Sequence, residues 1–230
     1  MKRILITGAS RGIGRAVAEK LAAPGRMLML HGRDTTALDE TRRAVEERGA
    51  TARIFSFDLA DPEAVRASVA EIAQARPDVL INNAGIAVVK PFQDLSLAEW
   101  QQTLAVNVTA PFILIQMLAG CMQAGDSIVN ILSVAAKTGF PSWSSYAMSK
   151  FALEGFSQSV REELRPRGIR VINIYPAATA TEIWNGVEGN WPREKMMSAN
   201  DVAEAVRYAL AQPPSLAVES IALGNTAGTL

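Results

Sequence analysis

The alternation of short apolar runs with longer amphipathic ones constrains the fold of this chain more than any other feature of its sequence. Seven short runs predict strands, at residues 3–7, 26–30, 52–57, 78–82, 127–132, 170–175 and 215–223. Most are almost continuously apolar, which is typical of strands in a parallel sheet covered on both faces. Helical patterns separate them, at about 12–23, 36–48, 62–75, 96–122, 144–166 and 199–211. The sequence therefore predicts an α/β fold, a doubly wound seven-stranded parallel sheet with helices on both faces.

The charge and cysteine content exclude several classes of function. Lys and Arg together number 23, as do Asp and Glu, so we expect no nucleic-acid partner and no membrane partner. Cys121 is the only cysteine and His31 the only histidine, so no intrachain disulfide and no metal site are expected. No stretch reaches the roughly 18 apolar residues of a membrane span, and the N-terminus enters a strand pattern without the apolar run of a signal peptide. We expect a cytoplasmic protein in which residues 1–230 form one domain.

A glycine-rich turn follows the first predicted strand. In "TGASRGIG", residues 7–14, Gly8, Gly12 and Gly14 fall between a strand and a helix. Glycine is required where the backbone turns tightly or approaches a phosphate closely, and a helix that begins near Gly12 would direct free N–H groups at an anion. The pattern predicts a cradle for the pyrophosphate of a dinucleotide. The alternative is a glycine-rich turn that binds nothing.

In the stretch "SSYAMSKFAL", residues 144–153, a tyrosine and a lysine lie four positions apart, on one face of a predicted helix. Tyr146 can simply pack against the aliphatic part of Lys150, which would support the helix modestly. Alternatively, the ammonium group favours the phenolate and lowers the pKa of the phenol from about 10 toward neutrality. The spacing alone does not decide between these two interpretations.

The ordered set of motifs along the chain favours the chemical interpretation. After the glycine turn come Asp58–Leu59, then "NNAG" at 82–85, Asn107 in a long helix, Ser133 after the fifth strand, Tyr146-x-x-x-Lys150, and "PAATATEI" at 176–183. In this order, over nearly the whole chain, they resemble the short-chain dehydrogenase/reductase family, in its compact single-domain branch with a Rossmann fold. One departure is Ala177, where the family usually has glycine after the proline.

The resemblance implies hydride transfer between a nicotinamide and a carbonyl or alcohol carbon of a small, apolar molecule. The implied catalytic residues are Asn107, Ser133, Tyr146 and Lys150. Tyr146 would give or take the proton, Lys150 would lower its pKa and bind the nicotinamide ribose, and Ser133 would donate to the substrate oxygen. Asn107 would interrupt a kinked helix and hold a water in a proton relay to Lys150.

The same resemblance implies a set of cofactor-binding residues. They are Gly8, Ser10, Arg11, Gly12, Ile13, Gly14, Arg33, Asp58, Leu59, Asn83, Ala84, Gly85, Tyr146, Lys150, Thr179 and Thr181. Asn83 would lie on the adenosine side and the two threonines at the nicotinamide carboxamide. Asn82 is expected instead to tie neighbouring strands together.

The end of the second strand favours NADP(H) over NAD(H). An NAD enzyme usually has Asp or Glu there to bind the ribose 2′-hydroxyl, but this chain has Gly32 and Arg33. Arg33 and Arg11 could bind a 2′-phosphate together, since a guanidinium group matches phosphate geometry. Two alternatives stay open: both arginines are solvated, or a shift of one residue brings Asp34 to the ribose.

The substrate side is less constrained by the sequence. Segment 183–198 holds two tryptophans and two methionines, and it either covers the active site or fills gaps in the core. Ala135, Phe140 and Trp143 suggest an apolar pocket wall, and Lys137 either meets an anionic substrate or is solvated.

The apolar faces of helices 96–122 and 144–166 predict a homodimer or homotetramer. A regulatory protein that senses NAD(P) is the alternative function. A sugar epimerase or dehydratase of the extended branch is a further one, although that branch usually carries a larger C-terminal substrate domain.

Overall fold

Seven parallel strands form the centre of the molecule. The structure is a computed structural model and describes residues 1–187, 189, 191–213, 215–226 and 228. The strands are β1 (Lys2–Ile6), β2 (Arg26–His31), β3 (Thr51–Phe55), β4 (Val79–Asn82), β5 (Ser127–Ile131), β6 (Arg170–Pro176) and β7 (Ser220–Leu223). Their order is β3-β2-β1-β4-β5-β6-β7 and each neighbouring pair is parallel, which confirms the doubly wound sheet.

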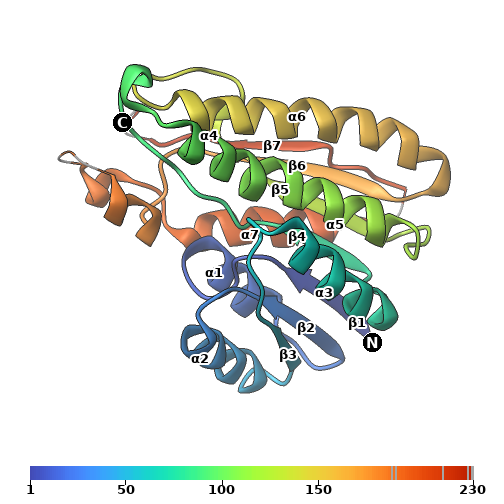
Figure 1. Ribbon diagram of the computed structural model, residues 1–230. Helices are drawn as coiled ribbons and strands as arrows, with labels where there is room; N and C mark the ends of the chain where they lie inside the picture. The colour runs from blue at the N-terminus through green and yellow to red at the C-terminus, as the bar shows by residue number, and fades with distance from the viewer. Residues whose placement is uncertain (188, 190, 214, 227, 229–230) are drawn as a thin grey trace.

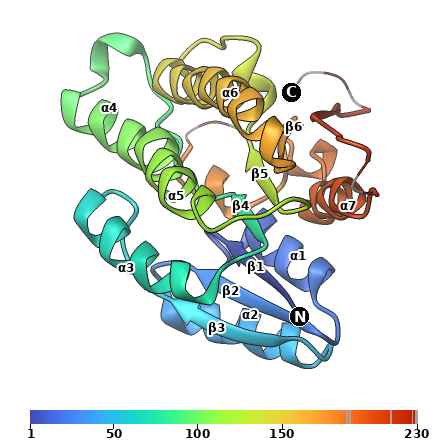
Figure 2. The ribbon, with the colours of Figure 1, turned by 90° about the vertical axis from the view of Figure 1, so that its right-hand side faces the viewer.

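Helices cover both faces of this sheet (Figure 1). They are α1 (Gly12–Leu21), α2 (Thr35–Glu46), α3 (Pro62–Ala75), α4 (Leu97–Leu104), α5 (Ala110–Ala119), α6 (Ser144–Leu164) and α7 (Ala199–Leu210). Figure 2 shows α3, α5 and α6 on one side of the sheet and α1 and α7 on the other. Their starts follow the sequence: Asp34, Asp61, Ser96 and Ser198 cap α2, α3, α4 and α7 with side-chain oxygens.

Successive strand residues point to opposite faces, and both faces are buried. Along β1, Ile4 and Ile6 pack in the cluster under α1, α2 and α7, while Leu5 packs in the cluster under α3, α5 and α6. The other inner strands alternate in the same way, which is why their sequences are continuously apolar.

Three predicted features differ from the structure. The last strand begins at Ser220 rather than at 215. Residues 215–217 and 219 are exposed, and Val218 packs against the core without joining a strand. The predicted helix 96–122 is divided into α4 and α5 by a π-helical segment, Ala105–Thr109, with Asn107 at its centre. That interruption agrees with the irregular helix expected there.

The third difference concerns the predicted absence of a segment long and apolar enough for a membrane span. The helical stretch Leu97–Ala119 is that long and that apolar, with a mean hydropathy of 1.4. Half of the most apolar 18 residues of this stretch is nevertheless buried. Ile113, Leu114 and Leu118 belong to the core under the sheet. Its hydrophobicity is therefore that of a core helix.

The strand order reverses between β1 and β4. The chain leaves β1 toward β2 on one side and leaves β4 toward β5 on the other, so a crevice opens at the carboxyl ends of these two strands. The glycine turn follows β1 and "NAG" follows β4, so both lie at this crevice.

Candidate active site

The glycine turn has the backbone that a phosphate cradle requires. Gly8 and Gly12 have positive φ angles of 66° and 54°, a region that favours glycine. A Cβ on Gly14 would lie 2.1 Å from the carbonyl oxygen of Gly8, so no other residue fits there. Arg11, the N-cap residue of α1, makes no side-chain cap, so the first N–H groups of that helix remain available to an anion. The turn therefore fits a pyrophosphate.

His31 supports this turn, a role that the sequence analysis missed. It is buried, its Nδ1 accepts from the Gly8 N–H at 3.4 Å, and its Nε2 donates to the Phe57 carbonyl at 3.1 Å. Burial lowers the pKa of His31 to about 4, so the ring is neutral at physiological pH.

Twelve of the sixteen predicted cofactor residues line one cavity of about 240 Å³, the glycine-turn cavity, and Gly14, Tyr146, Lys150 and Thr179 do not. Those that line it are Gly8, Ser10, Arg11, Gly12, Ile13, Arg33, Asp58, Leu59, Asn83, Ala84, Gly85 and Thr181. The Asn83 amide turns inward and donates to the carbonyls of Thr7 and Gly8, at 2.9 and 3.2 Å, so it fixes the turn. Gln102 and Glu182 also line the cavity, and no motif had pointed to them.

The groups at the end of β2 resolve one of the open alternatives. Asp34 caps α2 by accepting from the Ala37 N–H at 3.0 Å, and it does not line the glycine-turn cavity. Arg33 lines the cavity, is exposed, and pairs with Asp58 at 3.5 Å. Asp34 is therefore engaged at the start of α2, and Gly32 and Arg33 are the residues of this loop that line the cavity.

Tyr146, Ser133 and Lys150 converge at the carboxyl end of β5. Tyr146 and Lys150 lie one turn apart on α6. Ser133, whose Oγ accepts from the Ala135 N–H at 3.1 Å, lines the same cavity as Tyr146. Lys150 Nζ donates to the Ile131 carbonyl at 2.9 Å and lies 5.5 Å from the centre of the Tyr146 ring. A Cβ on Gly85 would lie 3.7 Å from Lys150 Nζ, so the glycine after β4 leaves room for that ammonium group.

The predicted lowering of the Tyr146 pKa is wrong for the protein alone. Burial raises the pKa of Tyr146 to about 12, although the hydrogen bond from Ser133 lowers it in part. Burial also lowers the pKa of Lys150 to about 8. Desolvation disfavours the charged form of each group, and a four-residue spacing does not reveal it.

Asn107 connects the segment after β4 to the catalytic helix. Its Oδ1 accepts from the Ile86 N–H at 2.9 Å, and its Nδ2 donates to the Ile86 carbonyl at 2.9 Å and to Ser149 Oγ at 3.0 Å. Ser149 Oγ in turn donates to the Tyr146 carbonyl at 2.7 Å. Both N–H groups of the amide are thus engaged by the protein, so this side chain holds Ile86 against α6 and has little capacity left to bind a water.

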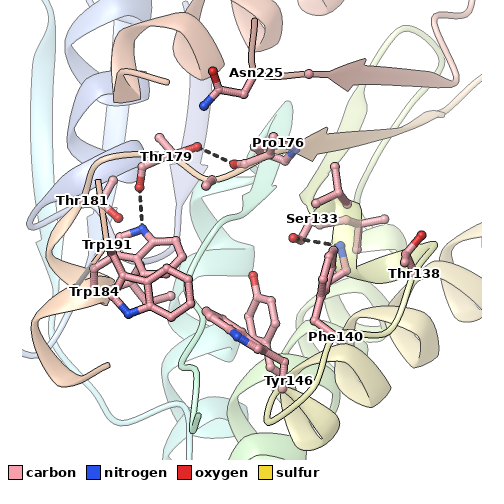
Figure 3. A pocket seen from close by; sticks show the side chains of 18 of the residues that line it. Ser133, Thr138, Phe140, Tyr146, Pro176, Thr179, Thr181, Trp184, Trp191 and Asn225 are labelled. Carbon is pink, nitrogen blue, oxygen red and sulfur yellow. Dashed lines mark hydrogen bonds between the residues drawn. The ribbon is translucent and has the colours of Figure 1, made fainter. Parts of the chain in front are cut away.

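A second, larger cavity of about 700 Å³ lies beside the first, and we call it the tryptophan cavity (Figure 3). Ser133, Tyr146 and Thr179 line it, together with Phe140 and Trp143 of the predicted apolar wall. Ile13, Thr181 and Ile183 line both cavities, so the two adjoin at these residues.

The segment that follows β6 holds the two threonines in place. Thr179 Oγ1 donates to the Ala177 carbonyl at 2.9 Å, and the backbones of Ala178 and Ala180 pair with Met197. Ala177 has no positive φ, so the alanine found where the family usually has glycine is accommodated without strain.

Segment 183–198 contains support for both interpretations given to it. Ile183, Trp184 and Trp191 line the tryptophan cavity, whereas Met197 packs against the core. Glu188 and Asn190 of this segment lie outside the described residues.

A buried polar network lies behind the catalytic helix, and sequence analysis anticipated only its first member. Asn82, Asn130 and Asn173 are aligned across β4, β5 and β6, and Asn82 donates to Asn130 at 2.9 Å, as expected of a strand tie. Asn130 donates to Asn173 at 3.2 Å, and Asn173 donates to Glu154 of α6 at 3.1 Å.

Glu154 completes this network and determines the surroundings of Lys137. The carboxylate accepts from Lys137 at 2.8 Å and from Tyr175. Burial acts to raise the pKa of Glu154, but the hydrogen bonds from Lys137, Tyr175 and Gln158 outweigh it and the pKa is lowered. Lys137, which had been considered as a contact for an anionic substrate, is instead ion-paired with Glu154 and does not line the tryptophan cavity.

Comparisons with known proteins agree with this geometry. A family model described as short chain dehydrogenase matches residues 2–190. The chain is 33% identical to a sepiapterin reductase of Chlorobaculum tepidum, over 100% of this chain and 99% of the relative. It is 35% identical to a D-threitol dehydrogenase of Mycolicibacterium smegmatis, over 82% of this chain and 76% of the relative. A crystal structure of a short chain dehydrogenase from Burkholderia cenocepacia in complex with NADP superposes with a TM-score of 0.87, at 33% identity over 96% of each chain.

Proposed function

The chain belongs to the short-chain dehydrogenase/reductase family, and from that premise we propose that it is an NADP(H)-dependent reductase of small, apolar carbonyl compounds. The observation that carries the proposal is the meeting of the two cavities. Ser133 and Tyr146 line the tryptophan cavity, which adjoins the glycine-turn cavity at Ile13 and Thr181. A dinucleotide held in the glycine turn can therefore reach a carbonyl group held by Ser133 and Tyr146.

The mechanism assigns one task to each side chain. NADP(H), when bound, supplies or accepts the hydride, and the protein handles the proton. Tyr146 Oη gives its proton to the substrate oxygen as negative charge develops there, while the Ser133 hydroxyl donates a hydrogen bond to the same oxygen. Because the pKa of Tyr146 is about 12, the phenol is protonated at neutral pH, which suits reduction.

Lys150 and Asn107 act around this pair. Lys150 is buried one helical turn from Tyr146, and its positive charge, when present, favours the phenolate that remains after proton donation. Lys150 Nζ also has hydrogens beyond the one given to Ile131, and we assign these to the ribose of the cofactor. Asn107 holds the backbone of Ile86 next to α6 through its hydrogen bonds to Ile86 and Ser149.

Two arginines support the preference for NADP(H). Arg33 and Arg11 are exposed and line the glycine-turn cavity, and the end of β2 brings Gly32 and Arg33 to it rather than Asp34. A 2′-phosphate there would compete with Asp58 for Arg33 and gain charge-assisted hydrogen bonds. The NADP bound by the Burkholderia cenocepacia relative is consistent with this preference.

The test is the oxidation of NADPH and NADH, followed by absorbance, with a panel of aldehydes, ketones and diketones. We expect turnover with NADPH and at least tenfold tighter binding of NADPH than of NADH, as expected for one charge-assisted phosphate contact. Equal binding of the two would contradict the arginine assignment. Tight NADPH binding with no turnover on any carbonyl compound would favour the regulatory alternative, and a cofactor recovered reoxidised after each cycle would favour an epimerase.

Other features of the proposal are coarser. We propose that the whole chain works as one nicotinamide-binding domain and that segment 183–198 covers the substrate, which is supported by the place of Trp184 and Trp191 in the cavity wall. A cytoplasmic location is in keeping with a single cysteine and no disulfide.

A further inference from the structure

The tryptophan cavity limits the charge of any molecule that enters it. Among the described residues that line it, none is a Lys, Arg, His, Asp or Glu, and the polar side-chain groups are hydroxyls, one amide and the indole N–H groups of the tryptophans. Lys137, which is adjacent in sequence to the lining residue Thr138, is already ion-paired with Glu154. An anionic or cationic substrate would lose its hydration here without an ionic partner, which is costly. The cavity therefore fits an uncharged molecule.

The aromatic content of the cavity is unusual for the chain. Of its four tryptophans, Trp143, Trp184 and Trp191 line this cavity. Their rings contact each other, with centroids 5.5 Å apart for Trp143 and Trp184 and 4.9 Å for Trp184 and Trp191. All three are half-buried, so each keeps part of its surface accessible. We call these three residues the tryptophan wall.

The wall is held rigidly and lies close to the reacting groups. Trp184 Nε1 donates to the Thr179 carbonyl at 2.8 Å, and Trp143 is the N-cap residue of α6. The Trp143 and Tyr146 rings meet edge to face, with centroids 5.5 Å apart. Figure 3 shows Trp184 and Trp191 on one side of the cavity and Ser133 and Phe140 on the other, with Tyr146 between them. A group attached to a carbonyl carbon held at Tyr146 therefore lies in the same cavity as the wall.

From this geometry, and resting on the function proposed above, we propose that the substrate is an uncharged aryl ketone or aldehyde whose ring packs against the tryptophan wall. A planar ring gains offset-stacked or edge-to-face contacts with indole that a saturated ring of equal size does not. Such contacts correspond to about a 2- to 13-fold preference each. In the reduction, the hydride adds to the carbonyl carbon and the Tyr146 proton to its oxygen, which yields the aryl alcohol.

The experiment compares two ketones with the same carbon skeleton, 2-acetylnaphthalene and its fully saturated decalin counterpart, with NADPH. We expect the aryl ketone to have a kcat/KM at least fivefold higher. Trp184→Leu and Trp191→Leu should each bring the ratio of the two values toward one. Trp100→Leu, which changes the tryptophan of α4 outside the cavity, should leave the ratio as it is.

A binding measurement without turnover separates this inference from the proposed function. Titration of the NADP⁺-bound protein with the unreactive 2-ethylnaphthalene should quench tryptophan fluorescence, and with ethyldecalin it should not. Quenching without any turnover of ketones would remove the proposed function and keep the aromatic site. Turnover of both ketones at equal kcat/KM, without selective quenching, would overturn the aromatic site and keep the reductase. Preference for a carboxylate-, phosphate- or ammonium-bearing ketone would overturn it as well.

Discussion

Tyr146 and Lys150 are one helical turn apart, and the protein around them favours the neutral form of both side chains. Burial disfavours the charged form of each, so the pKa of Tyr146 is raised to about 12 and that of Lys150 is lowered to about 8. At neutral pH the site therefore holds a protonated phenol beside a protonated ammonium group. The phenol is ready to donate, and the ammonium group stabilises the anion that donation leaves.

Replacement of Tyr146 by phenylalanine removes the proton donor and keeps the ring. We expect kcat for carbonyl reduction to fall by about 10²- to 10⁴-fold, because general acid catalysis contributes that much. The Kd for NADPH should stay nearly unchanged, since the ring contact with Trp143 remains. Steady-state kinetics and NADPH fluorescence measure the two quantities. Turnover close to wild type would remove the proton-donor role.

The lowered pKa of Lys150 predicts a pH-dependent stability. Between pH 8 and 10.5 the unfolded chain holds this proton and the folded protein has lost it, so raising the pH through this window stabilises the fold. We compare wild type with Lys150→Met by urea unfolding from pH 7 to pH 10. The free energy of unfolding of the wild type should rise relative to that of the variant by about 2 to 3 kcal/mol. A difference that is constant with pH would show that the pKa is not lowered.

At the scale of elements, the start of α1 has no space for even one added side-chain carbon at Gly14. A Cβ on Gly14 would lie 2.1 Å from the Gly8 carbonyl oxygen and 2.5 Å from Asn83 Nδ2. The Gly14→Ala variant must therefore displace the turn that forms the phosphate cradle. We expect it to lose about 1 to 3 kcal/mol of stability and most of its affinity for NADPH.

The matched control for Gly14→Ala is Ala16→Gly, in the same helix. It weakens α1 by about 1 kcal/mol through helix propensity but adds no atom to the turn. Thermal unfolding and NADPH titration of both variants separate the two effects. Equal loss of NADPH affinity in the two would mean that helix stability, and not the shape of the turn, determines binding.

The strands and helices could be predicted because their patterns are local. Apolar runs marked β1 to β6 within one or two residues at their ends. The inner strands are buried on both faces, whereas the edge strand β3 exposes Thr51 and Arg53. The start of β7 was missed because the apolar composition of "SLAVE" does not show where pairing begins. Pairing starts at Ser220, opposite Asn173 in the middle of β6.

The site was predictable only where a motif encodes it. The glycine turn, Ser133 and Tyr146 come from such motifs, and they do meet at the carboxyl ends of the strands. No motif encodes the tryptophan wall, because Trp143 and Trp184 lie far apart in the sequence and come into contact only in the folded protein. The pairing of Lys137 with Glu154 and the burial of Tyr146 were hidden for the same reason.

At the scale of the whole molecule, α5 and α6 leave aromatic side chains uncovered. Phe112 is 38% exposed and Phe151 is 45% exposed, and Phe112 contacts Phe156 edge to face. We propose that these helices pair with a second copy of the chain, as the sequence predicted for a homodimer or homotetramer.

Light scattering on the purified protein tests this assembly. We expect a dimer or tetramer for the wild type and a shift toward monomer for Phe151→Glu, because a buried charge without a partner opposes association. Phe92→Glu is the control, since Phe92 is 70% exposed in a short 3₁₀ turn away from α5 and α6. A monomeric wild type would exclude the pairing.

The aligned asparagines on β4, β5 and β6 affect how the chain folds into the correct strand register. Hydrocarbon side chains distinguish poorly between one ladder and the same ladder shifted along the strand by two residues, because valine, isoleucine and leucine replace one another with little penalty. A shifted β5 would place the Asn130 amide opposite aliphatic side chains, away from Asn82 and Asn173, and each unpaired amide would cost about 1 to 3 kcal/mol. The three amides therefore raise the free energy of intermediates in which these strands pair in a shifted register. The register that they favour sets the end of each strand, and with it the position of Ser133 after β5.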